Sequence, residues 1–226
     1  MREFLLSACP VLVWVFCAIH VAFIVILLGQ YKKTKNPLFL LSGLVAVGLC
    51  YDALILSLGT VMNEGAALKA LSQVRYISHG ALIPLLLPIC SYALGWKKIG
   101  KTVVWVITGV LIALGIGSGI TTVTYPENVA LVRYACDSAL TPGWSYTVST
   151  SVLAYGMVIP LVLAGIWVWI KQKTPKLFLS GFLMFAFSAL GPATGNFDLI
   201  FFISMMGEVL MVLFFWLYAK FNEAHK

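Results

Sequence analysis

The chain has 226 residues, of which 61% are hydrophobic and only 10% are charged, and its formal net charge is +7. A soluble domain carries roughly 25% charged residues, so this composition excludes a water-soluble globular fold, whose surface would expose large apolar patches. Within a bilayer the backbone must satisfy its own hydrogen bonds, which leaves helices or a closed barrel. Because the apolar runs are long and continuous rather than alternating, they favour helices.

Seven apolar runs approach or exceed the length of about 20 residues that a spanning helix needs. The sixth is the shortest, and only residues 191–196 separate it from the seventh, so a bent hairpin or a re-entrant segment is the alternative there. The Gly and Pro content of residues 191–196 favours a tight turn between two spans. We therefore predict an all-α membrane protein, a seven-transmembrane-helix bundle that forms a single domain over residues 1–226. The predicted spans are Phe4–Gly29, Leu38–Met62, Leu71–Leu94, Thr102–Thr122, Trp144–Ile170, Lys176–Leu190 and Phe197–Tyr218.

Lysines cluster after every second span. Basic loops stay on the cytoplasmic side of a membrane, so this alternation predicts an N-terminus outside and a C-terminus in the cytoplasm, in a plasma or inner membrane. The charge indicates attraction to the anionic lipids of the bilayer, and no nucleic acid partner is predicted because the lysines are divided among four short segments. These lysines are Lys32, Lys33, Lys35, Lys97, Lys98, Lys101, Lys171, Lys173, Lys176, Lys220 and Lys226.

The segment Tyr125–Gly143 is the longest loop on the predicted outer side. Its start at Pro126–Asn128 suggests a short helix lying on the outer surface, and Cys136 within it is interpreted as a free thiol. Since no segment is large enough for a soluble catalytic domain, we expect the protein to act within or beside the helical bundle.

Small residues and prolines within the spans predict how the helices pack and bend. The glycines at 115, 117 and 119 indicate close helix packing. Pro84, Pro88 and Pro160 lie within spans and are expected to kink them.

Ionisable side chains at membrane depth are expensive and usually mark function. Asp52 and Glu208 lie near the middle of the second and seventh spans, His20 lies in the first, and Arg75 and His79 lie in the outer half of the third. For each acid the alternative is a protonated carboxyl group that is hydrogen-bonded to a neighbour. For His20 the alternative is an ordinary hydrogen bond between helices.

The third span carries a group of polar residues on one helical face. Arg75, Ser78 and His79 are three or four residues apart, so their side chains project from the same side. Arg75 and Asp198 both lie near outer ends of their spans, and we predict an outer ion pair between them; the alternative is that Arg75 reaches the outer surface alone.

Two motifs in the second and third spans carry a resemblance to a known family. Arg75-Tyr76, then seven intervening residues and the run Pro84–Leu87, resembles the third helix of microbial (type 1) rhodopsins, and Leu56–Gly59 is similar to the end of their second helix. The resemblance covers the first three spans, and it implies a seven-helix bundle with the N-terminus outside. The alternative is another bacterial membrane protein family that shares only the bundle.

The chain departs from the rhodopsin pattern where the cofactor would bind. The family attaches retinal to a Lys in the middle of its seventh helix, whereas here Glu208 occupies about that depth and the nearest Lys is Lys220 at the end of the span. Ser78 stands three residues after Arg75, where many pumps of the family have an acidic counterion. We therefore expect no covalent retinal, and no cofactor or metal is predicted.

We expect a retinal-free, ligand-binding or sensory protein with an internal polar site that binds a small molecule or an ion. The alternative is a proton- or cation-coupled small-molecule transporter that uses the same acids. A minor alternative is an intramembrane lipid hydrolase in which His20, Asp52 and His79 hold one zinc ion; catalysis is otherwise not predicted. Since no output domain is visible, a sensor would need a cytoplasmic partner or a homo-oligomer.

Overall fold

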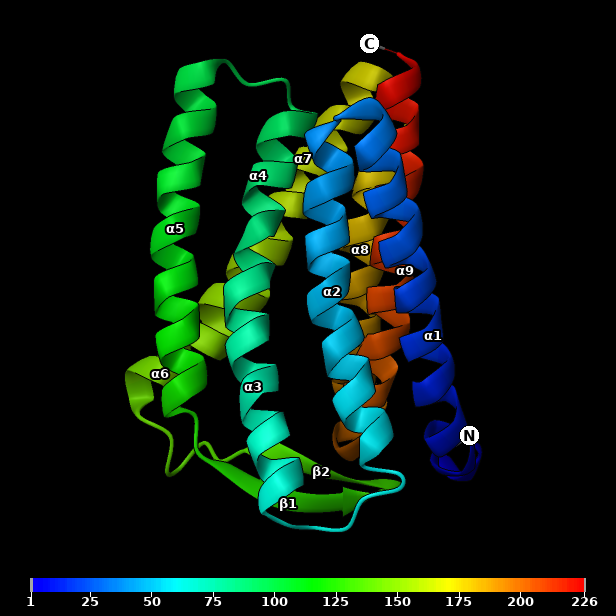
Figure 1. Cartoon of the computed structure of the whole chain (residues 1–226), viewed down its shortest axis with the longest axis vertical. Coiled ribbons are helices and arrows are strands. Elements are labelled where there is room, and N and C mark those ends of the chain that lie inside the picture. The colour runs from blue at the N-terminus through cyan, green and yellow to red at the C-terminus, as the bar shows by residue number, and fades with distance from the viewer. Residues whose placement is uncertain (1, 226) are drawn as a thin grey trace.

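The computed structural model describes residues 2–225, with the exception of the side chain of Phe197. Seven helices within this range are long and apolar enough to cross a membrane. They pack as one bundle (Figure 1), so the prediction of an all-α, seven-helix, multi-pass membrane protein is confirmed. The spans are α1 (Arg2–Thr34), α2 (Pro37–Leu58), Ala66–Ala93, α5 (Lys98–Thr121), Gly143–Gln172, α8 (Lys176–Ala193) and α9 (Ile200–Ala224).

The third and fifth spans are interrupted helices. The third consists of α3 (Ala66–Leu82), a 3-10 turn (Ile83–Leu85) and α4 (Leu86–Ala93), and Pro84 lies in the turn because it has no N–H to continue the α-helical ladder. The fifth consists of α6 (Gly143–Thr147), a π-helical segment (Val148–Tyr155) and α7 (Gly156–Gln172). Of the other two prolines, Pro88 lies in the first turns of α4 and Pro160 lies inside α7.

The sixth span is a separate helix by length and composition. α8 has 18 residues and ends at Ala193. Gly195, with φ of +71°, lies in the turn that leads through a 3-10 turn (Phe197–Leu199) into α9. α8 and α9 run side by side, as Figure 1 shows, and the re-entrant alternative is not what the structure forms.

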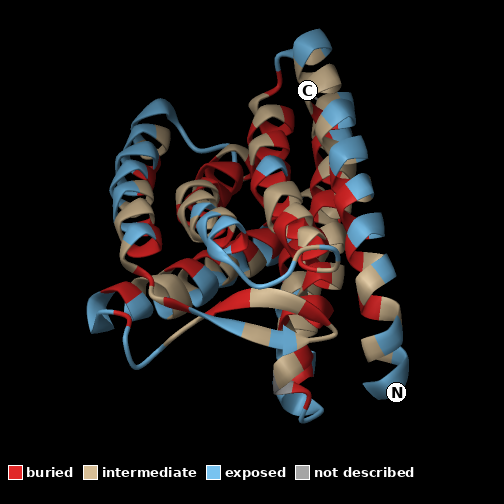
Figure 2. Ribbon diagram, turned by 60° about the horizontal axis from the view of Figure 1, so that its bottom comes forward, coloured by how far each residue is buried: buried red, intermediate tan, exposed pale blue. Residues whose placement is uncertain are grey.

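The prediction of a surface helix after Tyr125 is wrong. The segment forms an antiparallel hairpin of β1 (Thr124–Val129) and β2 (Leu131–Cys136), which turns at Ala130 with φ of +63°. The β-branched and aromatic residues that follow Pro126 favour a strand, and the Val132 N–H donates to the Gly59 carbonyl at 2.9 Å, which extends the pairing to the α2–α3 connection. Figure 2 shows β2 more buried than β1 beneath the helices.

The two ends of the bundle differ in charge. One end carries β1 and β2 together with Arg2 at the start of α1, and we call it the hairpin end. The other end carries the predicted lysine clusters and the end of α9, and we call it the lysine-rich end; Lys226 lies outside the described residues. The larger apolar core cluster, which includes Phe39, Leu86 and Phe215, lies in the lysine-rich half, and a smaller one around Leu56 and Phe202 lies in the hairpin half.

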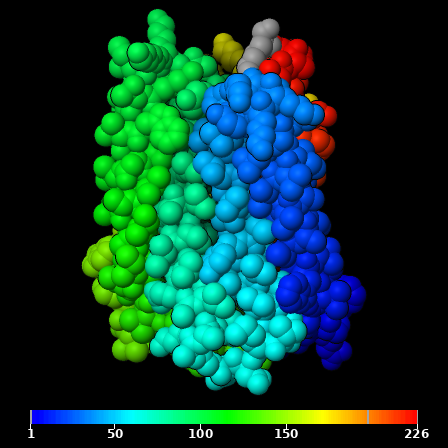
Figure 3. Space-filling view, viewed as in Figure 1, coloured from blue at the N-terminus to red at the C-terminus, as the bar shows by residue number. Residues whose placement is uncertain are grey.

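Glycines bring α3 and α5 into backbone contact. A Cβ atom on Gly80 would lie 2.2 Å from the carbonyl oxygen of Gly115, and one on Gly119 would lie 2.6 Å from the Cα atom of Ile77. The predicted close packing is therefore confirmed at Gly115 and Gly119, whereas Gly117 faces the Trp144 ring. Figure 3 shows α5 as the green flank of the molecule, beside α3.

Candidate functional site

A polar cavity of about 250 Å³ lies in the hairpin half of the bundle. Four separate elements supply its walls: α2, α3, β2 and the π-helical segment before α7. The polar groups in it are carboxylate, guanidinium, imidazole, phenol, thiol and hydroxyl groups. The lining residues are Asp52, Arg75, Tyr76, His79, Cys136, Ser149 and Thr150.

An ion pair between Asp52 and Arg75 joins α2 to α3 in this cavity. The Arg75 Nε atom is 3.1 Å from Oδ1 of Asp52, and the two side chains are only 10% and 17% exposed. The guanidinium also donates from Nη2 to the Tyr76 hydroxyl at 3.2 Å, and it lies 4.9 Å from the centre of that ring. Breaking such a buried pair is costly, because the partner left behind is an uncompensated charge.

The hairpin is tied to the same helix that carries Arg75. The Tyr76 hydroxyl donates to the Tyr134 carbonyl at 3.2 Å, and the Tyr134 hydroxyl bonds to both backbone groups of Gly65 at the start of α3. Gly59 is required beneath β2, since a Cβ there would lie 1.9 Å from the Val132 carbonyl oxygen. The hairpin thereby holds Cys136 in the cavity wall.

Arg133 of β2 connects the hairpin to α9. Arg133 pairs with Glu127 across the two strands, and its guanidinium lies 4.4 Å from the centre of the Phe201 ring. Burial lowers the pKa of Arg133, and the Glu127 carboxylate opposes that shift. The hairpin therefore contacts both α3 and α9.

A second cavity, of about 110 Å³, lies deeper in the bundle and is mostly apolar. Glu208 projects into it from α9 and is 4% exposed, and its Oε2 atom has no hydrogen-bond partner within residues 2–225. His79 lines this cavity as well as the polar one, so a single imidazole lies between them. Glu208 interacts electrostatically with both Asp52 and Arg75.

The structure brings together four of the predicted site residues. Asp52, Arg75 and His79 share the polar cavity, and Glu208 adjoins it through His79. The spacing of four residues between Arg75 and His79 places both on the face of α3 that is turned toward the cavities.

Two predicted residues lie outside both cavities. The Ser78 hydroxyl donates to the Arg75 carbonyl of its own helix at 3.0 Å. His20 is fully buried, and its Nδ1 bonds to the Phe16 carbonyl at 2.8 Å, one turn earlier in α1. The Ser78 hydroxyl is thus used within its own helix, whereas the buried Nε2 atom of His20 has no hydrogen-bond partner among the described residues.

The predicted outer ion pair between Arg75 and Asp198 is wrong. Arg75 pairs with Asp52, whereas Asp198 pairs with Arg2. The reason is the arrangement of the bundle: α1 packs against α9, so the start of α1 brings Arg2 to the start of α9, while α3 faces α2.

Sequence reasoning missed Tyr76, Cys136, Ser149 and Thr150. Tyr76 follows Arg75 directly, and this adjacency could have indicated that it belongs to the site. The place of Cys136 in the cavity wall could not be predicted without knowing that its segment forms a hairpin. Ser149 and Thr150 bond to the Tyr146 carbonyl and look like ordinary helix hydroxyls. Both line the cavity from a π-helical segment, where the spacing of an α-helix does not indicate which side a residue faces.

The zinc-dependent alternative lacks a ligand set. No group of three His, Cys, Asp or Glu side chains within residues 2–225 converges as a metal site would require. His20 in particular bonds to the Phe16 carbonyl of its own helix, as described above.

No protein-family model matches this chain, and no curated protein is significantly similar to it. Fold and site together define a class: a multi-pass, seven-helix membrane protein with paired internal cavities near one end.

Proposed function

We propose that this protein is a retinal-free, ligand-binding seven-helix membrane protein that acts as a sensor. The single observation that carries the proposal is the buried Glu208 carboxylate, whose Oε2 atom faces a mostly apolar cavity without a partner among residues 2–225. Buried polar groups are nearly always hydrogen-bonded, and ligand sites combine apolar walls with a few convergent polar groups.

The charges suggest the chemistry of the ligand. Asp52 is already neutralised by Arg75, so Glu208 is the acid in the two cavities that lacks an ion-pair partner among the described residues. A ligand with a cationic or hydrogen-bond-donating group would satisfy it, while its compact apolar part occupies the space between Leu49 and Met184. His79 would contact the ligand at the boundary of the two cavities.

The hairpin end is the proposed entry side. The polar cavity lies there, and the lysines gather at the opposite end, which favours a cytoplasmic lysine-rich end in a plasma or inner membrane. The N-terminus is then outside and the ligand is extracellular or periplasmic. A sensor of this kind would pass its signal to a cytoplasmic partner or to a second copy of the chain.

A proton or cation pathway is the second candidate, because His79 lies between the two acids. What disfavours it is the lysine-rich half, where a continuous apolar cluster that includes Phe39, Leu86 and Phe215 fills the centre. A transport pathway would have to open that cluster.

Native mass spectrometry of the purified protein tests the proposal. We expect a small molecule to co-purify with the wild type, and Glu208→Gln to weaken its binding about tenfold or more, since a hydrogen bond to a charged group is worth about 1.5–3 kcal/mol. Glu64→Gln, at an exposed position in the α2–α3 connection, is the matched control.

Liposome flux separates the two candidates. A ligand-free protein whose proton or cation flux is abolished by Glu208→Gln would favour the transporter. If neutralising both Asp52 and Glu208 changes neither binding nor flux, the site has no function of either kind.

A further inference from the structure

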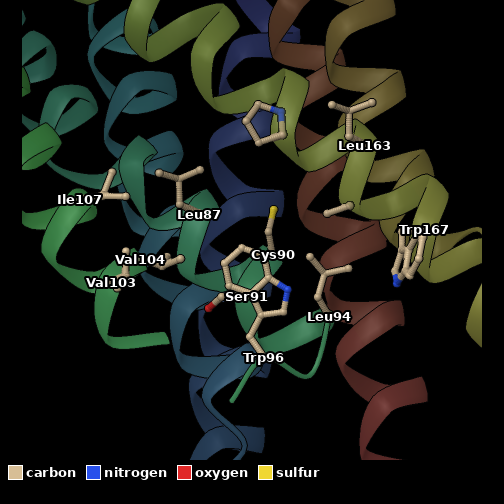
Figure 4. A pocket seen from close by; sticks show the side chains of 12 residues that line it. Leu87, Cys90, Ser91, Leu94, Trp96, Val103, Val104, Ile107, Leu163 and Trp167 are labelled. Carbon is tan, nitrogen blue, oxygen red and sulfur yellow. The ribbon is translucent and has the colours of Figure 1, made fainter. Parts of the chain in front are cut away.

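A third cavity, which we call the groove, shares no lining residue with the Glu208 cavity. It measures about 870 Å³ and lies between α4, α5 and α7 in the lysine-rich half. Figure 4 shows its walls: Val103 and Ile107 face it from one side, Leu163 and Trp167 from the other, and Trp96 closes one end. Its volume is within the roughly 300–1,000 Å³ of small-molecule sites.

The groove exists because α5 diverges from its neighbours. Gly80 and Gly115 hold α3 and α5 in backbone contact toward the hairpin end. Toward the lysine-rich end α5 stands apart from α4, as Figure 1 shows. Val103, Leu163 and Trp167 are between 52% and 61% exposed, so the groove opens on the side of the bundle that faces the acyl chains of the bilayer.

The lining offers little for a polar ligand. Among the lining residues, Ser91 carries a hydroxyl group, and that hydroxyl already donates to the Pro88 carbonyl at 2.9 Å. The remaining walls are almost entirely aliphatic, aromatic or thiol groups. An acyl chain matches this surface.

Lysines from two elements lie next to the Trp96 and Trp167 side of the groove. Lys97 follows Trp96 and caps α5, and Lys98 and Lys101 lie in the first turn of that helix, whose N-terminal end also favours an anion. Lys101 Nζ lies 4.6 Å from the centre of the Tyr92 ring, and Lys171 Nζ lies 5.3 Å from that of Trp167. Residues 94–107 and 160–173 contain no Asp or Glu.

We propose that this groove binds an anionic phospholipid, with one acyl chain between α5 and α7 and the phosphate among Lys97, Lys98, Lys101 and Lys171. Basic pockets between membrane helices bind anionic headgroups in this way. A second copy of the chain fits less well, because a symmetric contact would bring two lysine clusters together without acids between them. The site is independent of the Glu208 cavity and of the function proposed for it.

Lipid titrations followed by native mass spectrometry test this site, with dioleoyl phosphatidylglycerol and dioleoyl phosphatidylcholine as probes. We expect the wild type to bind the first phosphatidylglycerol at least about tenfold more tightly than phosphatidylcholine, from the attraction of several lysines. The triple variant Lys97→Gln, Lys98→Gln, Lys101→Gln should lose that preference. Its matched control is Lys32→Gln, Lys33→Gln, Lys35→Gln, at the same end of the bundle but away from the groove, which should keep it.

A groove-filling variant tests the acyl-chain part of the site. Ala164→Trp places a large side chain on the wall and should weaken both lipids. Because the lysines lie on the surface, the lysine variants remain informative if Ala164→Trp does not fold. Equal affinity of the wild type for the two lipids, an unchanged preference in the lysine triple variant, or a protein dimer that Ala164→Trp dissociates would each overturn the proposal.

Discussion

The two halves of this bundle are held together differently. In the hairpin half, an ion pair between Asp52 and Arg75 and a chain of tyrosine hydrogen bonds surround two cavities. In the lysine-rich half, Phe39, Leu86 and Phe215 belong to a continuous apolar cluster. The larger groove of that half lies at its periphery, between α5 and α7.

This difference between the two halves indicates where in a helical bundle a binding site can form. Helices in lipid associate through close packing and hydrogen bonds rather than through a hydrophobic driving force. In the lysine-rich half the helices pack mainly through the apolar cluster at its centre. The hairpin half combines glycine contacts between α3 and α5 with buried polar contacts, and the polar contacts adjoin its two cavities.

The largest expected effect comes from removing the ion pair of the hairpin half. Arg75→Gln leaves the Asp52 carboxylate without its partner, and we expect a loss of about 3 kcal/mol of stability. Thermal unfolding in detergent measures it, and Lys69→Gln, at an exposed position of the same helix, is the control. The double variant with Asp52→Asn should recover part of the loss; an Arg75→Gln protein as stable as the wild type would show that the pair does not tie the two helices.

The matching test of the lysine-rich half is Gly165→Ala. A Cβ on Gly165 would lie 2.4 Å from the Cα atom of Phe178, so α7 and α8 must separate. We expect a loss of about 2 kcal/mol, as for overpacked cores, in the same unfolding assay. Gly29→Ala is the control, because a Cβ there meets nothing within 4 Å; equal stability of the two variants would contradict close packing as the basis of this half.

A smaller effect is expected at the hairpin. Tyr134→Phe removes the hydroxyl that bonds to Gly65, at a cost of about 1 kcal/mol. Amide hydrogen exchange of β1 and β2 should accelerate, while that of α8 and α9 stays unchanged. Tyr125→Phe, on the exposed side of the hairpin, should have no such effect.

The smallest effect is expected at Ser78. Its hydroxyl bonds only within α3, so Ser78→Ala should change stability by less than about 0.5 kcal/mol. Native mass spectrometry should find the same bound small molecule as in the wild type. If the Ser78→Ala protein lost that molecule, Ser78 would have to be counted as part of the binding site.

The seven helices could be predicted because each is a local property of a long apolar run. The meeting of Asp52, Arg75 and His79 was also within reach, since depth and helical spacing place all three in one half. The partner of Arg75 could not be predicted, because it depends on which helices are neighbours: Asp52 and Asp198 are both acids in the hairpin half, and only the packing of α1 against α9 assigns Asp198 to Arg2.

The hairpin and the neighbouring cavity wall could not be predicted from the sequence, for a related reason. A loop that begins Pro-Glu-Asn is typical of a helix start, and the strand pairing that replaces it depends on Gly59 lying beneath Val132. Sequence spacing at a period of 3.6 also misplaces Ser149 and Thr150, because the helix there does not have that period.

That π-helical segment, Val148–Tyr155, walls both cavities: Ser149 and Thr150 line the polar one, and Leu153, Ala154 and Tyr155 line the deeper one. In a π-helix each N–H donates to the carbonyl five residues earlier, so the ring closed by each hydrogen bond contains one residue more than in an α-helix. Rewinding it to α-helical pairing would rotate the preceding residues by about 100° relative to α7, the angle of one residue. The two hydroxyls would then turn away from the cavity wall, so the winding of one short stretch of backbone decides whether α2 and α3 face hydroxyl groups across the polar cavity.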